Sequence, residues 1–298
     1  MVGAVGGRDG YFQSLIRPTL EESGLDISRV RTVDDDQTGV SVIVVSSCDA
    51  GDNRIFFSPG ANYSGMQPTP AVIIQALAAP IPDLIVMQGE IPLETTILIL
   101  RRICRFKQRN REEGQKGIDI GPTEFPEDAF AGVDHLIMNE TEADLMAPSA
   151  ERVQHAEPNA DSVGHREQAA SYFHGRGVAC VVITLGAKGA WYSVNDIRES
   201  NGGVVKAFSD EVPAATVGNV LDTTAAGDTF VGGYATYIAR WREALRNEGK
   251  VDGVTEETES EGTYRAMAEG AIKRGALAAA RCVERHGSMR SIPWENEI

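Results

Sequence analysis

Three short apolar runs, each followed directly by a polar segment, constrain the fold of this chain most strongly. They are residues 84–87 before 88–90, residues 136–138 before 139–142, and residues 181–183 before 184–186. Runs of this length, separated by helical stretches, are typical of βαβ units. Their near-continuous apolarity indicates strands of a parallel sheet that is buried on both faces. Since ligands of open α/β sheets bind outside the carboxyl ends of the strands, we expect the polar segments to converge on one crevice.

The size and charge of the chain limit the classes of function. A chain of 298 residues with 42% apolar content can form one large hydrophobic core, so we expect a single domain over 1–298. Its formal net charge of -15 argues against nucleic acid or an anionic membrane surface as partner, because both usually need a basic face. The four cysteines show no CxxC spacing, which argues against a zinc site.

Membrane and export signals are not found in the sequence. No apolar stretch approaches the roughly 20 residues that span a bilayer, and the N-terminus has no basic region followed by an apolar core. We therefore expect a soluble intracellular protein, in the cytoplasm or alternatively in the nucleus.

A different pattern occupies residues 38–62. Alternating valines at 40–44 lead into turn residues at 48–52, and a second extended run at 54–57 ends before Pro59. This order predicts an antiparallel hairpin. Two further segments, 147–165 and 247–262, are polar and charged, and we expect them to be surface insertions.

Residues 221–233, LDTTAAGDTFVGG, carry the strongest functional signal. Small residues let a backbone approach a ligand closely, and the N–H groups of a helix's first turn can receive an anion such as phosphate. Asp228, at the predicted start of a helix, would stand beside that anion as a general base. A tight turn in which Asp228 caps its helix is the structural alternative.

The polar segments after the three apolar runs also have two interpretations. Glu90 is either a solvated loop residue or an acceptor for two hydroxyl groups of a ligand. Asn139 and Glu142 have the spacing of a capping box, in which each satisfies a helix-end donor of the other. Residues 184–189 indicate a glycine-containing turn. The chain has neither a GxxxxGK[ST] nor a GxGxxG string, which argues against P-loop and dinucleotide-binding proteins.

The string DTTAAGDTF at 222–230, with Gly232 and Gly233, resembles the DTxAAGDxF signature of ribokinase-type carbohydrate kinases. The resemblance covers almost the whole chain, from Val2 to Ile298. It implies an α/β fold, a ribokinase-like three-layer sandwich with a mostly parallel central sheet and a small β lid that includes 38–62. It also implies ATP-dependent phosphorylation of a pentose, with D-ribose to D-ribose 5-phosphate as the leading reaction, the cofactors ATP, Mg²⁺ and K⁺, and a homodimer joined through the lid strands.

The same resemblance assigns roles to individual residues. Asp228 becomes the base that contacts the sugar and nucleotide, Glu90 a second sugar ligand, and the N–H groups of Ala225, Ala226 and Gly227 an anion hole. Asn139 is expected at the nucleotide and Glu142 at Mg²⁺. The nucleotide loop consists of Thr184, Leu185, Gly186, Ala187, Lys188 and Gly189. A monovalent cation is assigned to Asp222, Thr224, Cys282, Arg285, Gly287 and Ser291, several of them through carbonyl oxygens.

By the family resemblance, the first part of the family's pattern has no counterpart in this sequence. Residues 1–10 resemble its second large strand, so the resemblance predicts that a first strand, part of the lid and a GGKGAN helix start are lacking here. A sugar pocket without them would lose one wall and several hydrogen-bond partners. Two functions therefore stay open: a pentose kinase whose active chain is longer, and a catalytically impaired nucleotide-binding fragment or pseudoenzyme.

Overall fold

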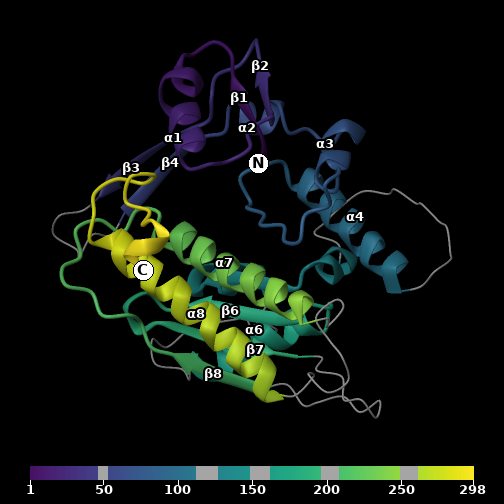
Figure 1. Cartoon of the computed structure of the whole chain (residues 1–298), viewed down its shortest axis with the longest axis vertical. Coiled ribbons are helices and arrows are strands. Elements are labelled where there is room, and N and C mark those ends of the chain that lie inside the picture. Colours follow the sequence, from purple (N-terminus) through teal and green to yellow (C-terminus); the bar gives the residue numbers. More distant parts are fainter. Residues whose placement is uncertain (46–52, 112–126, 148–161, 196–207, 249–260) are drawn as a thin grey trace, which may run out of the picture. The chain divides into compact units, whose positions relative to one another are not determined.

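The computed structural model describes residues 1–45, 53–111, 127–147, 162–195, 208–248 and 261–298 (Figure 1). Contacts divide the chain into two compact units, which are described one at a time. Unit 1 is Met1–Val44 with Asn53–Gly132, and unit 2 is Val45–Asp52 with Val133–Ile298. Most of the two predicted insertions, at 148–161 and 249–260, and the predicted hairpin turn at 48–52 lie outside the described residues.

A four-stranded sheet forms the centre of unit 2, in the order β5-β6-β7-β8. Its strands are β5 (His135–Asn139), β6 (Cys180–Thr184), β7 (Ala190–Val194) and β8 (Phe208–Val212). The strands predicted at 136–138 and 181–183 are thereby confirmed, and they pair in parallel. The side chains of Val181, Val182 and Tyr192 are fully buried, which explains why β6 has no alternating polar positions.

The sheet of unit 2 is mixed, because β6–β7 and β7–β8 pair antiparallel. The reason lies in the connection between β6 and β7, which is the short 3₁₀ turn η3 (Gly186–Lys188). A parallel neighbour would need a crossover of a dozen or more residues. The expectation of parallel pairing is therefore correct for β5–β6, whereas β7 and β8, for which the sequence makes no prediction, pair antiparallel.

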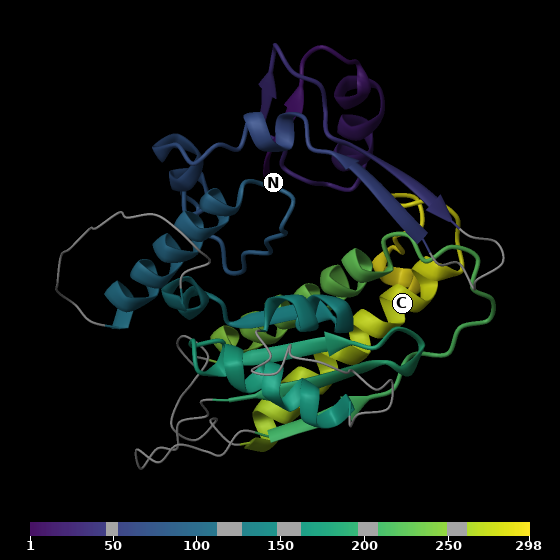
Figure 2. The same cartoon turned by 180° about the vertical axis from the view of Figure 1, so that it is seen from behind.

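Helices cover both faces of this sheet, as Figures 1 and 2 show from opposite sides. The helices are α5 (Glu140–Met146), α6 (Ser162–His174), α7 (Ala226–Asn247) and α8 (Glu261–Val283), followed by the 3₁₀ turn η5 (Glu295–Glu297). Helices α7 and α8 approach closely at glycines. A Cβ atom on Gly275 would lie 2.7 Å from the Phe230 carbonyl oxygen, and one on Gly233 would lie 3.0 Å from that of Arg274.

Unit 1 contains two separate pairs of strands. In the first pair, β1 (Val2–Gly6) and β2 (Arg29–Val33) run parallel. Around them are η1 (Phe12–Ile16), α1 (Arg17–Glu22), α2 (Ala61–Ser64), α3 (Pro70–Gln75), α4 (Leu93–Arg111) and η2 (Glu127–Gly132). A small cluster of buried side chains joins β1 to the region of α2 and α3, and its members are Ala4, Ala61, Met66 and Val72.

The second pair consists of β3 (Val40–Val45) and β4 (Asn53–Ser58), where the sequence predicts a hairpin. Apolar side chains of this pair are exposed, with Val42 at 58% and Phe56 at 65%. The pair therefore presents apolar surface that no described part of unit 1 covers.

The prediction of a strand at 84–87 is wrong, because these residues form no strand in the structure. Val86 is 55% exposed. A strand exists only with a hydrogen-bonded neighbour. In the described part of unit 1, strand pairing is confined to β1–β2 and β3–β4. Apolar periodicity reports a tendency toward burial and does not reveal whether a partner strand is present.

Of the helices within the described ranges, none combines the length and the apolarity that a membrane crossing requires.

Candidate active site

The start of α7 has the geometry expected of an anion site. Ala225 is the N-cap and lies in the left-handed region at φ 61°, ψ 12°. The first regular helical bond runs from Thr229 N to Ala225 O at 2.9 Å, so the N–H groups of Gly227 and Asp228 precede the helical ladder. The Ala226 N–H donates to Thr223 O at 3.2 Å. A left-handed alanine costs about 1–2 kcal/mol, and such strain is often found at functional sites.

Asp228 is an exposed residue of the first turn of α7. Because the N-cap is Ala225 and makes no side-chain capping bond, the alternative that Asp228 caps the helix is wrong. A carboxylate in the first turn is stabilised by the positive end of the helix dipole, and this one is accessible from solvent.

Asn139 and Thr184 stand side by side at the carboxyl ends of β5 and β6, where the register pairs them. Asn139 begins α5 with a complete capping box. Its Oδ1 accepts from Glu142 N at 2.8 Å, while its own N–H donates to Glu142 Oε2 at 2.8 Å. Both side chains are exposed, and the cap holds them in fixed positions. Carboxylate and amide oxygens are suitable ligands for Mg²⁺, so this pair fits that ion chemically.

The segment 184–189 forms the tight connection between β6 and β7. Leu185 N donates to Gly189 O at 2.8 Å, and the Leu185 side chain is buried, which leaves only its backbone for a ligand. Gly189 has a φ of 108°, and a Cβ there would lie 2.1 Å from Val212 O, so packing alone requires glycine. Gly186, Ala187 and Lys188 are the exposed part of the connection.

Asp222 joins the loop before α7 to the segment after α8. Its Oδ1 accepts from Thr224 N at 2.9 Å, and its Oδ2 accepts from Gly287 N at 3.0 Å. The Thr224 hydroxyl, the Gly287 N–H and the Thr224 N–H hold the pKa of Asp222 below its ordinary value. The carboxylate is therefore ionised across the neutral pH range.

A buried group lies next to Asp222. The Cys282 sulfur is 3.5 Å from Thr224 O and 3.2 Å from the Ser291 hydroxyl, and both Cys282 and Ser291 are fully buried. Arg285 N donates to Cys282 O at 3.0 Å, while the Arg285 guanidinium binds Glu297 at 2.6 Å. The structure thus brings together all six residues that the resemblance assigns to a monovalent cation. The atoms that these residues could offer to a cation are mainly backbone and hydroxyl oxygens, which suit a hard cation such as K⁺.

One anchor of this region has no signal in the sequence. The Val283 carbonyl accepts from Leu221 N at 2.8 Å and from Asp222 N at 3.3 Å. Any residue type supplies such a carbonyl, so side-chain identity cannot reveal it.

Glu90 belongs to unit 1, unlike the other predicted site residues. It is exposed and follows the irregular segment 84–87.

Comparison with known proteins decides the family. Residues 1–295 match the pfkB family of carbohydrate kinases. The chain belongs to this family. It is 29% identical over 286 residues to a ribokinase of Haemophilus influenzae, which covers 95% of this chain and 74% of that protein. The expectation of a carbohydrate kinase is thereby confirmed at the level of the family.

Solved structures agree on the fold of this pfkB-family chain. A ribokinase from Giardia lamblia matches with a TM-score of 0.72 at 21% identity, covering 99% of this chain and 81% of that one. An Arabidopsis thaliana ribokinase complexed with ribose and ATP matches with a TM-score of 0.64 at 23% identity, covering 99% and 79%. The predicted ribokinase-like α/β fold is confirmed.

Proposed function

We propose that this chain transfers the γ-phosphoryl group of ATP to a hydroxyl of a pentose, with D-ribose to D-ribose 5-phosphate as the specific reaction. Membership of the pfkB family supports a sugar as acceptor. The ribokinase names of its relatives, one of them complexed with ribose and ATP, support ribose and this nucleotide. The observation that carries the proposal is the exposed Asp228 behind the left-handed Ala225 at the start of α7.

In the proposed step, Asp228 takes the proton from the primary hydroxyl of the sugar as its oxygen attacks the γ-phosphorus. The bond from that phosphorus to the β-phosphate oxygen breaks, and ADP leaves. Phosphoryl transfer needs alignment and charge stabilisation above all. The N–H groups of Ala225, Ala226 and Gly227 would supply the stabilisation, with the 3.2 Å bond from Ala226 to Thr223 exchanged for one to the phosphate.

The remaining site residues receive binding roles in the proposal. Glu90 would accept hydrogen bonds from sugar hydroxyls, and the backbone of the 184–189 connection would contact the nucleotide. Asn139 would contact the nucleotide phosphates, and Glu142 would hold Mg²⁺, which shields phosphate charge when bound. The six residues from Asp222 to Ser291 described above would hold K⁺, which adds a positive charge beside the anion hole.

We also propose a homodimer joined through β3 and β4. Its support is the exposed apolar surface of this pair, made of Val40, Val42, Val44, Ile55, Phe56 and Phe57. Val42→Lys should shift the chain toward monomer in analytical ultracentrifugation, whereas Val86→Lys, an exposed valine outside the pair, should not.

A second candidate function is nucleotide binding without sugar turnover. It is favoured by the finding that residues 84–87, directly before Glu90, form no strand. A loosely held Glu90 would bind a sugar weakly, while the groups at the start of α7 would still bind a nucleotide.

One assay distinguishes the two candidates. ADP release by the purified chain is measured with ribose, with deoxyribose and without sugar, and ADP binding is measured separately by calorimetry. Ribose-dependent ADP release, with ribose 5-phosphate identified by mass spectrometry, supports the kinase. ADP binding without sugar-dependent release would support the second candidate and refute the first for this chain.

A further inference from the structure

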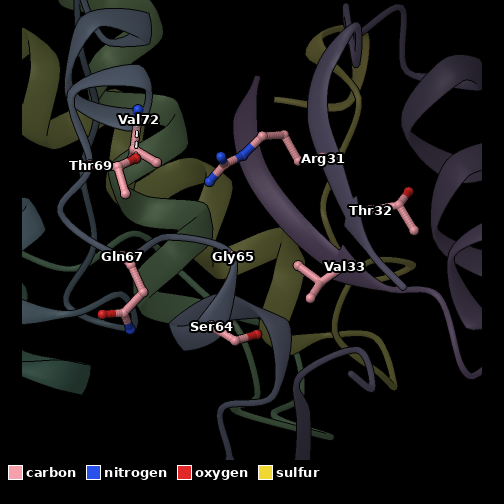
Figure 3. Close-up of a pocket in the computed structure, with 8 residues that line it drawn as sticks. All are labelled: Arg31, Thr32, Val33, Ser64, Gly65, Gln67, Thr69 and Val72. Atoms are coloured by element: carbon pink, nitrogen blue, oxygen red, sulfur yellow. Dashed lines mark hydrogen bonds between the residues drawn. The ribbon is translucent and has the colours of Figure 1, made fainter. Parts of the chain in front are cut away.

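A cavity of about 250 Å³ lies within unit 1, and none of its lining residues has a role in the proposed kinase site. Strand β2 forms one wall, and the segment from α2 to α3 forms the other (Figure 3). Its lining residues are Arg31, Thr32, Val33, Ser64, Gly65, Gln67, Thr69 and Val72. Arg31 is the only charged residue among these eight.

Figure 3 shows the Arg31 side chain reaching from β2 toward Thr69 and Val72, whereas Thr32 points away from the cavity. The Arg31 guanidinium has no hydrogen bond or ion pair with any described residue. Its Nε and Nη2 atoms are moreover shielded from solvent. A buried donor without an acceptor is costly, and more so when it is charged. The cavity wall therefore carries a half-buried guanidinium whose Nε and Nη2 atoms have no acceptor among the described residues.

Other arginines of the chain show what this side chain ordinarily binds. Arg101 uses its Nε and Nη2 atoms to hold both carboxylate oxygens of Asp128, at 3.0 and 3.3 Å. Arg29, on the same strand as Arg31, donates to the carbonyl oxygens of Gln75 and Ala79. The Nε and Nη2 atoms, which bind the carboxylate in Arg101, are the two atoms that are shielded and without a partner in Arg31.

Asp36, which contacts the lining residue Ser64, is already engaged. Asp36 accepts from the Ser64 hydroxyl at 2.5 Å and from Gln37 N at 2.8 Å, and these bonds hold its pKa below the ordinary value. The hydroxyl proton of Ser64 thus points at Asp36. Thr69 differs, because its oxygen accepts from Val72 N at 3.4 Å, which leaves its own O–H to donate into the cavity.

We propose that this cavity binds a small organic carboxylate. The Arg31 guanidinium turns into the cavity and pairs with the carboxylate through two N–H groups, while the Thr69 hydroxyl donates a third hydrogen bond. The carbon skeleton of the ligand packs against Val33 and Val72. The cavity has the volume of about eight water molecules, so a branched acid of a few carbons fits. This proposal is independent of the kinase function, because it uses none of the residues assigned to sugar or nucleotide.

The test is a titration of the full chain with isobutyrate, followed by the NMR signals of the arginine Nε–H groups and by isothermal calorimetry. Isobutyramide has nearly the same shape without the charge, and inorganic phosphate is a tetrahedral anion. We expect saturable isobutyrate binding that shifts one arginine Nε–H signal, at least tenfold weaker binding of both other probes, and the same result with ADP present.

Variants identify the residue responsible. Arg31→Lys keeps the charge but loses the bidentate hydrogen bonding of the guanidinium, and we expect at least tenfold weaker isobutyrate binding. Arg31→Met should abolish binding and should melt no lower than the parent chain, because it removes two shielded guanidinium donors that have no acceptor. Arg8→Met removes the same charge from an exposed arginine of the same unit and should leave binding within twofold.

Three results would overturn the proposal. They are no saturable binding of isobutyrate, equal binding by the Arg31→Met variant, and binding of phosphate as tight as that of isobutyrate.

Discussion

The two units use similar apolar strand sequences with opposite results. In unit 2, β6 and β7 are interior strands of a four-stranded sheet, and Val181, Val182 and Tyr192 are fully buried. In unit 1, β3 and β4 pair only with each other in the described residues, and Val42 and Phe56 are largely exposed. A two-stranded pair alone is marginally stable in water. The comparison indicates that unit 2 is stabilised by its own core, whereas unit 1 depends on further contacts.

This difference coincides with the division of the proposed site. The candidate groups for phosphate, nucleotide and cation lie on unit 2, while Glu90, the candidate sugar ligand, lies on unit 1. Changes in unit 2 should therefore affect the chemical step and the stability, and changes in unit 1 should affect mainly sugar binding.

The largest effect is expected from Asp228→Asn, which keeps the shape of the side chain and removes the base. We predict a decrease in kcat of about 10²–10⁴-fold with ADP binding unchanged. Asp34→Asn makes the same exchange at an exposed position of unit 1 and should leave kcat within twofold. Unchanged turnover in the Asp228 variant would refute its assignment as base.

Core truncation should distinguish the units by stability. Ile183→Ala removes a fully buried side chain from β6 and should cost about 2–5 kcal/mol of unfolding free energy. Val86→Ala, at a side chain of unit 1 that is 55% exposed and lies outside the β3–β4 pair, should cost less than about 0.5 kcal/mol. Urea unfolding followed by circular dichroism measures both. Tryptophan fluorescence reports unit 2 alone, because Trp191, Trp241 and Trp294 all belong to it. Equal costs for the two variants would contradict the comparison.

Glu90→Gln tests the division of the site. We predict an increase in KM for ribose of about 10-fold or more, since a charged acceptor is worth about 1.5–3 kcal/mol, with KM for ATP unchanged. Glu94→Gln in the same unit is the control. An equal increase in both KM values would show that the units do not divide the substrates in this way.

Asp222→Asn should cost about 1–3 kcal/mol of stability, because Thr224 and Gly287 lose a charged acceptor. Since the pKa of Asp222 is lowered in the folded chain, its contribution is present above the unfolded value of about 3.9 and is lost as pH falls through the lower folded value. The gap between parent and variant in urea unfolding should thus be constant near neutrality and shrink in acid. A difference in unfolding free energy that increases in acid would contradict the predicted direction of this pH dependence.

The smallest effect is expected from His174 in α6. Burial lowers its pKa, while its ring bonds Val178 O at 2.8 Å and the Ser193 hydroxyl at 2.9 Å. A lowered pKa means that the unfolded chain takes up the proton first, so stability should fall as pH drops below about 6.5. His174→Gln should flatten this dependence. A dependence that persists unchanged in the variant would assign it to other groups.

The sequence predicts those features of unit 2 that depend on local pattern. The strands β5 and β6, the capping box of Asn139 and Glu142 and the start of α7 follow from apolar runs, cap spacing and small residues, which act over a few residues. The sequence also grouped the six residues around Asp222, though through a family resemblance and not through their spacing.

Features that depend on distant partners could not be predicted. Residues 84–87 have a strand pattern but no strand, because pairing depends on a neighbour elsewhere in the chain. The antiparallel β7 and β8 depend on the length of one connection. The unpaired Arg31 guanidinium depends on which carboxylates the fold brings near, and no motif encodes such an arrangement.

The glycine contacts between α7 and α8 have a mechanical consequence. At Gly233 and Gly275 the two helices lie too close for a larger side chain, so these contacts have little room to adjust. The beginning of α7, with Asp228, and the end of α8, with Cys282, are therefore coupled as parts of one stiff body. A ligand that orders either end should damp the motion of the other, even without touching it.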